Sequence, residues 1–287
     1  MKRLICILIF ASCCVACSDD GDTREPVIEG HSIFRADVET LTFLGGSDFE
    51  HIWLKGENIG VYGSLQGENN EFILKRDYYD RTGEAEFYGP KVKGDVIMAY
   101  WPYDAAAEAR IGAFPMTVSS EQVRCENPYE QFLETSRLFA RYDMYGDGKL
   151  HFEYPLGAIA VEIDYAVTVK KIILSSETRK LSGRGYVDEN MTFAIASNGS
   201  NSITLDCGDG IVSTPEAKER FHIMLPAGEY AERELTLTIE AVPASDSFSY
   251  KMKPITVGRV SVAENNIVAV RIGSDLPDFG FEPNPLD

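Results

Sequence analysis

The stretch that decides the fold is Ile159-Ala160-Val161-Glu162-Ile163-Asp164-Tyr165, in which large apolar side chains occupy every second position. This spacing is typical of a β-strand with one buried face, because successive side chains of a strand point to opposite sides of the sheet. A helix would scatter the same residues around its circumference. The stretch therefore predicts a strand that buries its apolar positions and exposes the three residues between them.

The same alternation recurs in residues 221–225, 235–241 and 268–272, and shorter β-rich runs at 255–257 and 260–262 lie between clusters of Gly, Pro, Asn and Asp. Helical character is confined to two short stretches, residues 104–110 and 130–142. Many short strands separated by turn residues are typical of all-β sandwiches. A polar stretch with glycines at residues 142–149 divides the chain. We therefore expect two sandwiches in tandem, at residues 31–147 and at residues 148–287, the second with an extended tail.

The N-terminal sequence is typical of a secretory signal. Lys2 and Arg3 precede a run of uncharged residues from Leu4 to Val15, which is shorter than the roughly 20 residues that a membrane-spanning helix needs. The run ends in Val15-Ala16-Cys17, which resembles a bacterial lipobox, and Cys13 after Ala11 and Ser12 is the second choice of lipidated cysteine. The resemblance implies a signal peptide at residues 1–16 and lipidation of Cys17, whose acyl chains would anchor the protein in a membrane.

Composition excludes several classes of partner. Asp and Glu number 45 against 27 Lys and Arg, so the formal charge is −18. Removal of residues 1–16 takes away Lys2 and Arg3 and no acid, which lowers the charge to −20. A polyanion would be repelled, so nucleic acid is not an expected partner. Of the six cysteines, only Cys125 and Cys207 remain as thiols after lipidation, and either a disulfide in an oxidising compartment or two buried free thiols fit the sequence.

The chain offers no catalytic motif. The Gly-x-Ser-x-Gly turn of serine hydrolases is absent, and the four histidines lack the close-spaced partners of a zinc site. Residues 143–148 lack the ligands of a calcium-binding loop, and residues 183–185 lack the third glycine of a phosphate-binding loop. We expect both segments to be turns. We therefore expect no catalytic residue, no metal site and no cofactor. Exposed aromatic residues would suit sugar stacking, but core packing fits these candidates better: Tyr78, Tyr79, Tyr100, Trp101 and Tyr103.

Several segments together resemble one family. Residues 53–62 (WLKGENIGVY), residues 99–103 (AYWPY), the hydrophobic strand at 152–165 and residues 225–230 (LPAGEY) are similar, in order and spacing, to stretches of the fimbrillin-like lipoproteins of the Bacteroidetes, the subunits of type V pili. The resemblance implies two transthyretin-like β-sandwich domains and a structural, adhesive role without an active site. It also implies an outer-membrane, surface-exposed lipoprotein that becomes part of a fimbria.

The acidic residues 17–30 fit two descriptions, a solvated tether and a signal similar to those that send lipoproteins of this group to the cell surface. In the family, a protease cuts after a basic residue, the first strand leaves, and the groove accepts a strand of the next subunit. Arg35 is the expected cleavage site, Arg24 the second choice, and a plain surface charge the alternative for Arg35. The donor would come from residues 260–272 and the tail with Phe279 and Phe281.

The expected partners are other fimbrial subunits by strand exchange, a host or bacterial surface receptor, and the outer membrane through the lipid. The alternative function is a glycan-binding lipoprotein of the cell surface.

Overall fold

The computed structural model describes residues 31–43, 50–54, 56–75, 84–108, 111–164, 166–243, 250–252, 254–273 and 281–283. The described residues form strands throughout and a single short helix, α1 (Pro128–Thr135), which confirms the all-β prediction. Several residues singled out by the sequence lie outside this part of the chain: the signal peptide, Cys17, Arg24, Tyr78, Tyr79 and Phe279.

The N-terminal half is a barrel. Its seven strands close in the order β1-β10-β9-β6-β3-β4-β5 because β1 pairs with both β5 and β10. Closure leaves no unpaired sheet edge, and the interior is filled by aromatic rings. The strands are β1 (His31–Val38), β3 (Asn58–Gly63), β4 (Asn70–Leu74), β5 (Ala85–Pro90), β6 (Ile97–Trp101), β9 (Leu138–Tyr142) and β10 (Lys149–Glu153), and the buried rings include Phe72, Phe87, Phe139 and Phe152.

The C-terminal half contains two larger sheets. One has the order β16-β11-β22-β2, with β16 (Arg220–Pro226), β11 (Leu156–Ile163), β22 (Asn266–Ile272) and β2 (Thr42–Phe43). The other has the order β23-β19-β18-β12-β15-β8, with β20 also paired to β18. Its strands are β8 (Glu121–Val123), β12 (Val167–Ser176), β15 (Ser202–Ser213), β18 (Leu235–Pro243), β19 (Tyr250–Met252), β20 (Ile255–Thr256) and β23 (Phe281–Pro283). Their apolar faces belong to one continuous buried cluster.

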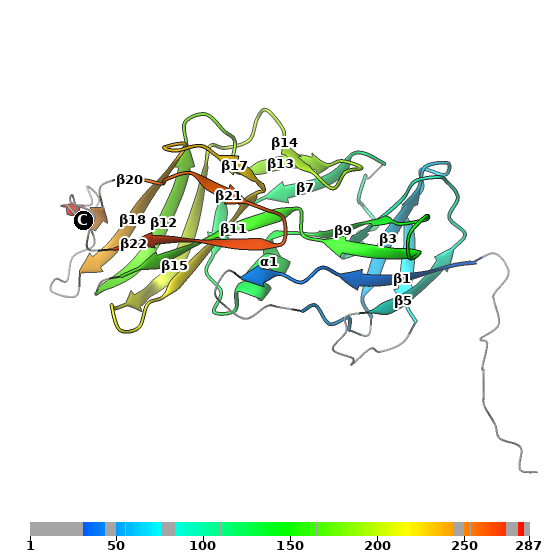
Figure 1. The fold of residues 1–287 in the computed structure, drawn as a ribbon, viewed down its shortest axis with the longest axis horizontal. Helices are drawn as coiled ribbons and strands as arrows, with labels where there is room; N and C mark the ends of the chain where they lie inside the picture. Colours follow the sequence, from blue (N-terminus) through cyan, green and yellow to red (C-terminus); the bar gives the residue numbers. More distant parts are fainter. Residues whose placement is uncertain are drawn as a thin grey trace, which may run out of the picture.

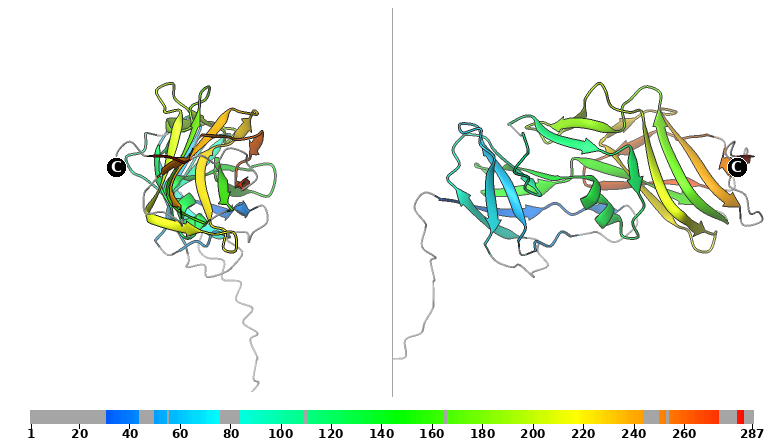
Figure 2. Two further views of the ribbon diagram at one scale, coloured as in Figure 1. Left: turned by 90° about the vertical axis from the view of Figure 1, so that its left-hand side faces the viewer. Right: turned by 180° about the vertical axis from the view of Figure 1, so that it is seen from behind.

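The two halves lie end to end along the long axis of the molecule (Figures 1 and 2). They are also interlocked, since β7 (Phe114–Val118) pairs with β13 (Gly183–Val187), which in turn pairs with β14 (Phe193–Ile195). In addition, β8 runs parallel to β15, and β2 runs parallel to β22. The expected boundary between residues 147 and 148 stays a prediction, as do the two transthyretin-like sandwiches; β10, which follows that boundary, completes the barrel.

The strand predicted from residues 159–165 exists as β11, but the expectation that it exposes one face is wrong. All eight residues from Leu156 to Ile163 are buried, including Glu162. The face that was predicted to be buried includes Gly157, where β21 (Val260–Val262) and the turn after it lie directly against β11. The opposite face, with Ala158, Ala160 and Glu162, is buried as well. At Gly157 a Cβ atom would lie 2.3 Å from the carbonyl oxygen of Ala263, so only glycine allows this approach.

The glycines at 183 and 185 are also placed differently from expectation. They belong to strand β13 and not to a turn. Gly185 is required in the strand because a Cβ atom there would lie 2.1 Å from the carbonyl oxygen of Ala194 on the neighbouring β14. The turn expected at residues 143–148 is confirmed and joins β9 to β10.

Candidate functional site

Strand β1 is the element around which a functional site can be built. It pairs antiparallel with β5 over six residues and parallel with β10 over four. Phe34 and Ala36 are buried in the barrel, whereas Ile33 and Arg35 point outward. The Phe34 ring contacts those of Phe72 and Tyr142, with centroids 5.4 and 5.1 Å away. We call the space that β1 fills between β5 and β10 the β1 slot.

A polar cluster fastens β1 to β10. The Nδ1 atom of His151 lies 2.7 Å from a carboxylate oxygen of Asp37, and its Nε2 atom lies 3.0 Å from one of Asp147. Lys149 Nζ lies 3.6 Å from Asp37 and also contacts Glu84. Burial by itself would lower the pKa of His151, but the hydrogen bonds to Asp147 and Asp37 outweigh burial and raise it. A protonated His151 therefore links a β1 carboxylate to the turn before β10.

Arg35, the predicted cleavage residue, lies in the middle of β1. Its side chain is 69% exposed, and its Nε atom lies 3.7 Å from the Glu86 carboxylate. Residues 31–38 form a single strand, so Arg35 lies within a strand and not between two strands. Arg35 is paired with Glu86 on one side and Lys149 on the other. Cleavage after Arg35 therefore requires β1 to leave these partners, at least locally.

The two outer edges of the β16-β11-β22-β2 sheet differ. On β16 the backbone N–H and C=O of Met224 bond to the amide of Gln122, at 3.0 and 2.7 Å. The C=O of His222 accepts from Gln131 Nε2 at 2.7 Å. On the other edge, β2 pairs only with the first two residues of β22, and within the described chain no strand pairs with the outer side of residues 268–272. One edge is therefore closed by side chains, and the other is partly open.

The segments expected to supply a donor strand are placed unequally. Val260–Val262 and Asn266–Ile272 form β21 and β22, and β22 pairs along six residues with the buried β11. Removing β22 would therefore open the core. The tail strand β23 is attached by only three residue pairs, all to β19. It lies at the end of the molecule that is remote from the barrel (Figure 1).

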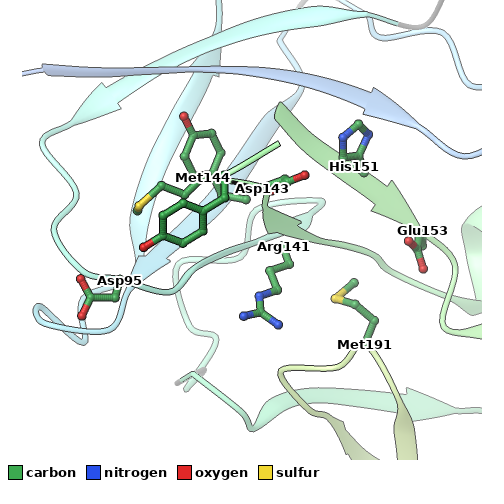
Figure 3. Close-up of a pocket in the computed structure, with 9 residues that line it drawn as sticks. Asp95, Arg141, Asp143, Met144, His151, Glu153 and Met191 are labelled. Atoms are coloured by element: carbon green, nitrogen blue, oxygen red, sulfur yellow. Dashed lines mark hydrogen bonds between the residues drawn. The ribbon is translucent and has the colours of Figure 1, made fainter. Parts of the chain in front are cut away.

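A cavity of about 370 Å³ opens beside the turn between β9 and β10 (Figure 3). His151, Arg141, Asp143 and Glu153 line it, together with Tyr145, whose side chain is almost fully exposed. His151 contacts two carboxylates here but no serine, threonine or cysteine, so the arrangement lacks a nucleophile for acyl transfer. Among the residues that the structure describes, no group of three His, Cys, Asp or Glu side chains is placed to hold a metal ion.

Of the aromatic candidates for sugar stacking, Tyr100 is buried in the core, as the packing argument favoured, and Trp101 and Tyr103 are partly buried against it. Tyr78 and Tyr79 lie outside the described residues. Tyr100 is 1% exposed, and Trp101 contacts His51 and Trp53 edge to face. Tyr103 packs against the same cluster. Burial lowers the pKa of His51 to about 4, so this ring is neutral and bonds to the Tyr129 hydroxyl. Among the residues that the structure describes, the exposed tyrosine rings are Tyr88, Tyr145 and Tyr186. The sequence pattern did not identify any of the three as a candidate for sugar binding.

The two remaining thiols are free in this structure. Cys207 is buried on β15, and burial raises the pKa of its thiol to about 12. Cys125 is half-buried, and burial together with the Glu134 carboxylate raises the pKa of its thiol. Both are therefore protonated and weak nucleophiles at neutral pH. In the described part of the chain, no helix combines the length and the apolar composition that crossing a membrane requires.

Comparison with known proteins gives structural likeness only. No protein-family model matches the chain. No curated protein matches it either. A solved structure described as a candidate cell adhesion protein from Parabacteroides distasonis is similar with a TM-score of 0.48 and 11% identity, over 88% of this chain and 90% of the other.

Two further solved structures are similar. The tip fimbrial protein Mfa3 of Porphyromonas gingivalis, with a C-terminal truncation, gives a TM-score of 0.44 and 8% identity over 88% of this chain and 97% of the other. A fimbrial protein from Bacteroides ovatus gives a TM-score of 0.39 and 12% identity, over 83% of this chain and 48% of the other. The three structures are described as fimbrial or candidate cell adhesion proteins, and all three come from Bacteroidetes.

Proposed function

We propose that the protein is a structural subunit, or a tip or anchor adhesin, of a surface fimbria. It is exported as a lipoprotein through Cys17 to the outer membrane and is assembled by β-strand addition. The single observation that carries the proposal is the position of β1. It is the first described strand of the chain, and it alone closes the barrel between β5 and β10.

An empty β1 slot would bind an extended segment strongly. Cleavage after Arg35 and loss of residues 31–35 would leave most of the inward backbone groups of β5 without partners, while residues 36–38 stay paired with β10. An incoming strand would restore the lost hydrogen bonds. The loss would also uncover the apolar space that Phe34 occupies. Main-chain bonds would then supply affinity, and the alternating side-chain positions would supply specificity.

Cleavage after Arg35 would separate the lipid anchor from the rest of the chain. The released piece would run from Cys17 to Arg35 and the remainder would begin at Ala36, as the resemblance implies. Arg24 is the second choice of site. The donor that the fold releases most easily is the tail beyond Ile272 with β23, because β23 is held by three residue pairs.

The positions of the β1 slot and of the C-terminal tail in the molecule favour an open polymer. The barrel and β23 lie at opposite ends of the molecule (Figures 1 and 2). A tail at one end reaches the slot of a neighbour more readily than its own slot. Head-to-tail contacts of this kind produce filaments when the rotation between subunits does not close a ring. Two transthyretin-like domains in tandem, as the family implies, suit such a chain of contacts.

The proposal assigns no catalytic, metal or cofactor role to any residue, and it includes no nucleic acid. The partners are other fimbrial subunits and a surface receptor. Glycan binding, the alternative, gains no support from Tyr100, Trp101 and Tyr103, because Tyr100 is buried and the other two rings are partly buried against the core.

N-terminal sequencing of subunits from purified surface filaments tests the proposal. We expect chains that begin at Ala36 in the wild type. An Arg35→Ala variant should accumulate as uncut lipoprotein outside filaments, whereas Arg24→Ala should behave as wild type. If all subunits in the filaments begin at lipidated Cys17, a shaft role is contradicted, and the only role that remains is that of a permanently anchored subunit.

A further inference from the structure

A second, larger cavity lies where the two halves of the molecule meet. It has a volume of about 780 Å³ and is lined by strands β7 and β13, by the residues that follow β14, by residues 104–108 and by the end of α1. Its volume falls within the roughly 300–1,000 Å³ typical of ligand sites, which occur preferentially between domains. We call it the cleft.

Strand β13 contributes an exposed aromatic ring to the lining of the cleft. The alternation of β13 directs Arg184 and Tyr186 outward on the same face, while Gly185 between them is buried. Tyr186 lies opposite Pro115 on β7 and Ala194 on β14, and it is 53% exposed. Because its neighbours are short, the ring is free to contact a ligand. A tyrosine ring in such a place offers an apolar face and a hydroxyl at its edge.

The cleft is also lined by an ion pair, Arg137 with Asp104, that is fixed by contacts within the protein. The Arg137 guanidinium lies 3.0 Å from a carboxylate oxygen of Asp104 and 5.6 Å from the centroid of the Tyr100 ring. The hydrogen bond from Arg137 lowers the pKa of Asp104, with a second bond from the Ala106 N–H. The pair is therefore charged, and its orientation is set before a ligand binds. Fixing polar groups in advance reduces the entropy lost on binding.

The charges of the cleft select the class of ligand. Arg184 makes no ion pair in the described part of the chain, and the Arg137–Asp104 pair is neutral as a unit. The carboxylates of Glu108 and Glu134 are exposed at the same cavity. An anionic ligand would meet these two acids and a chain of net charge −18. An uncharged ligand rich in hydroxyl groups can bond to carboxylate, guanidinium, amide and hydroxyl side chains together.

We propose that the cleft binds a neutral oligosaccharide. The Tyr186 ring lies against the apolar face of one sugar ring, and Arg184 and the Arg137–Asp104 pair hydrogen-bond to its hydroxyl groups. The inference deepens the adhesive role proposed above and rests on the surface location assigned there. It does not depend on strand addition, because no residue of β1, β5 or β10 lines the cleft.

Isothermal titration calorimetry on the purified full chain in detergent tests the inference. The probes are the hexasaccharides of maltose, cellulose, mannan and xylan type, with a polygalacturonic acid hexamer as the charged comparison. We expect saturable binding of at least one neutral hexasaccharide, and weaker or no binding of the charged one. Tyr186→Ala should weaken affinity by about tenfold or more, which corresponds to about 1.4 kcal/mol. Arg184→Gln should weaken it severalfold.

Tyr145→Ala is the matched control, since it removes an exposed tyrosine at the other cavity and should leave affinity unchanged. Tyr186 is an exposed side chain, so unfolding curves should show that its variant remains folded. Absence of heat with all neutral probes, preference for the charged hexamer, or equal losses in the two tyrosine variants would overturn the inference. Filament assembly, measured separately in the same variants, should remain intact, so failure of sugar binding and failure of assembly are distinguishable.

Discussion

Glu162 illustrates how one residue departs from the pattern around it. The alternation of β11 predicts an exposed acid, but the side chain is buried, and its two oxygens each lie 2.8 Å from an arginine Nε atom, of Arg220 and of Arg271. Burial alone would raise the pKa of this carboxyl, but the two arginines outweigh burial and lower it. A sequence pattern contains no information about such partners, because they come from strands about 60 and 110 residues away.

Glu162→Gln should lower the free energy of unfolding at pH 7 by about 1–3 kcal/mol, because the amide cannot accept two charged hydrogen bonds as well as a carboxylate does. A lowered pKa stabilises the fold above the ordinary carboxyl value, near 4.3, and this stabilisation is lost as the pH falls through the folded value. Denaturant unfolding at pH 7 and pH 3.5 measures the difference between the two proteins. It should shrink at the lower pH, and a difference independent of pH would contradict the assignment.

His151 predicts a pH dependence with the opposite sign. Its pKa is raised by Asp147 and Asp37, so its contribution to holding β1 is fully present below the ordinary histidine value, about 6.5, and is lost as the pH rises through the folded value. Because the ring is partly exposed, we expect an effect of at most about 1 kcal/mol. Amide hydrogen exchange of β1 should therefore be slower at pH 5.5 than at pH 8 after correction for intrinsic rates. His151→Gln should abolish this dependence; an unchanged dependence would assign it to another group.

At the scale of elements, alternation identified the strands better than it identified their surroundings. In β18 the apolar residues are buried and the residues between them are half-buried, as the pattern predicts. In β11 and β16 nearly every residue is buried, and elements from other parts of the chain pack against them: β21 against β11, and α1, β7 and β15 against β16. Parallel pairs such as β1 with β10 and β11 with β22 were beyond prediction, since they join segments more than 100 residues apart. Tyr186 and Arg184 were missed because their glycine-rich strand resembles a turn.

The hydrogen bonds from the Gln122 amide to the outer edge of β16 should contribute to the free energy of unfolding. Gln122 is 3% exposed and satisfies both backbone groups of Met224. Gln122→Leu should lower the free energy of unfolding by about 1–3 kcal/mol, because buried N–H and C=O groups would lose their partners. Thermal or denaturant unfolding measures it. Val123→Ala, at the exposed neighbouring position on β8, should change stability little, and equal losses in the two variants would contradict the role given to Gln122.

Strand β1 predicts a link between packing and proteolysis. Phe34→Ala should lower the free energy of unfolding by about 3–5 kcal/mol and speed cleavage at Arg35 by an arginine-specific protease, because the strand would leave the barrel more often. Ile33→Ala is the matched control, since Ile33 is the neighbouring apolar residue and is 50% exposed. It should alter the cleavage rate little. Equal acceleration in both variants would show that cleavage does not depend on packing of β1 in the barrel.

At the scale of the whole molecule, the fold combines a strand that can leave at one end with a weakly attached tail at the other. The interlocked β7–β13 and β8–β15 pairs hold the two halves together independently of β1. Removal of residues 31–35 should therefore leave both halves connected and expose the β5 side of the β1 slot. The barrel is then no longer closed, and its newly exposed strand edges favour pairing with another chain.

The most direct test is to cut the purified protein after Arg35 and follow its size by native mass spectrometry, with the full tail and with residues 274–287 deleted. The account predicts a ladder of multimers only when the chain is cut and carries its tail. Uncut protein and cut protein without the tail should remain monomeric. Two results would contradict assembly by strand addition. One is that protein with its tail stays monomeric although residues 31–35 have been cleaved off and lost. The other is that cut protein without the tail forms multimers to the same extent.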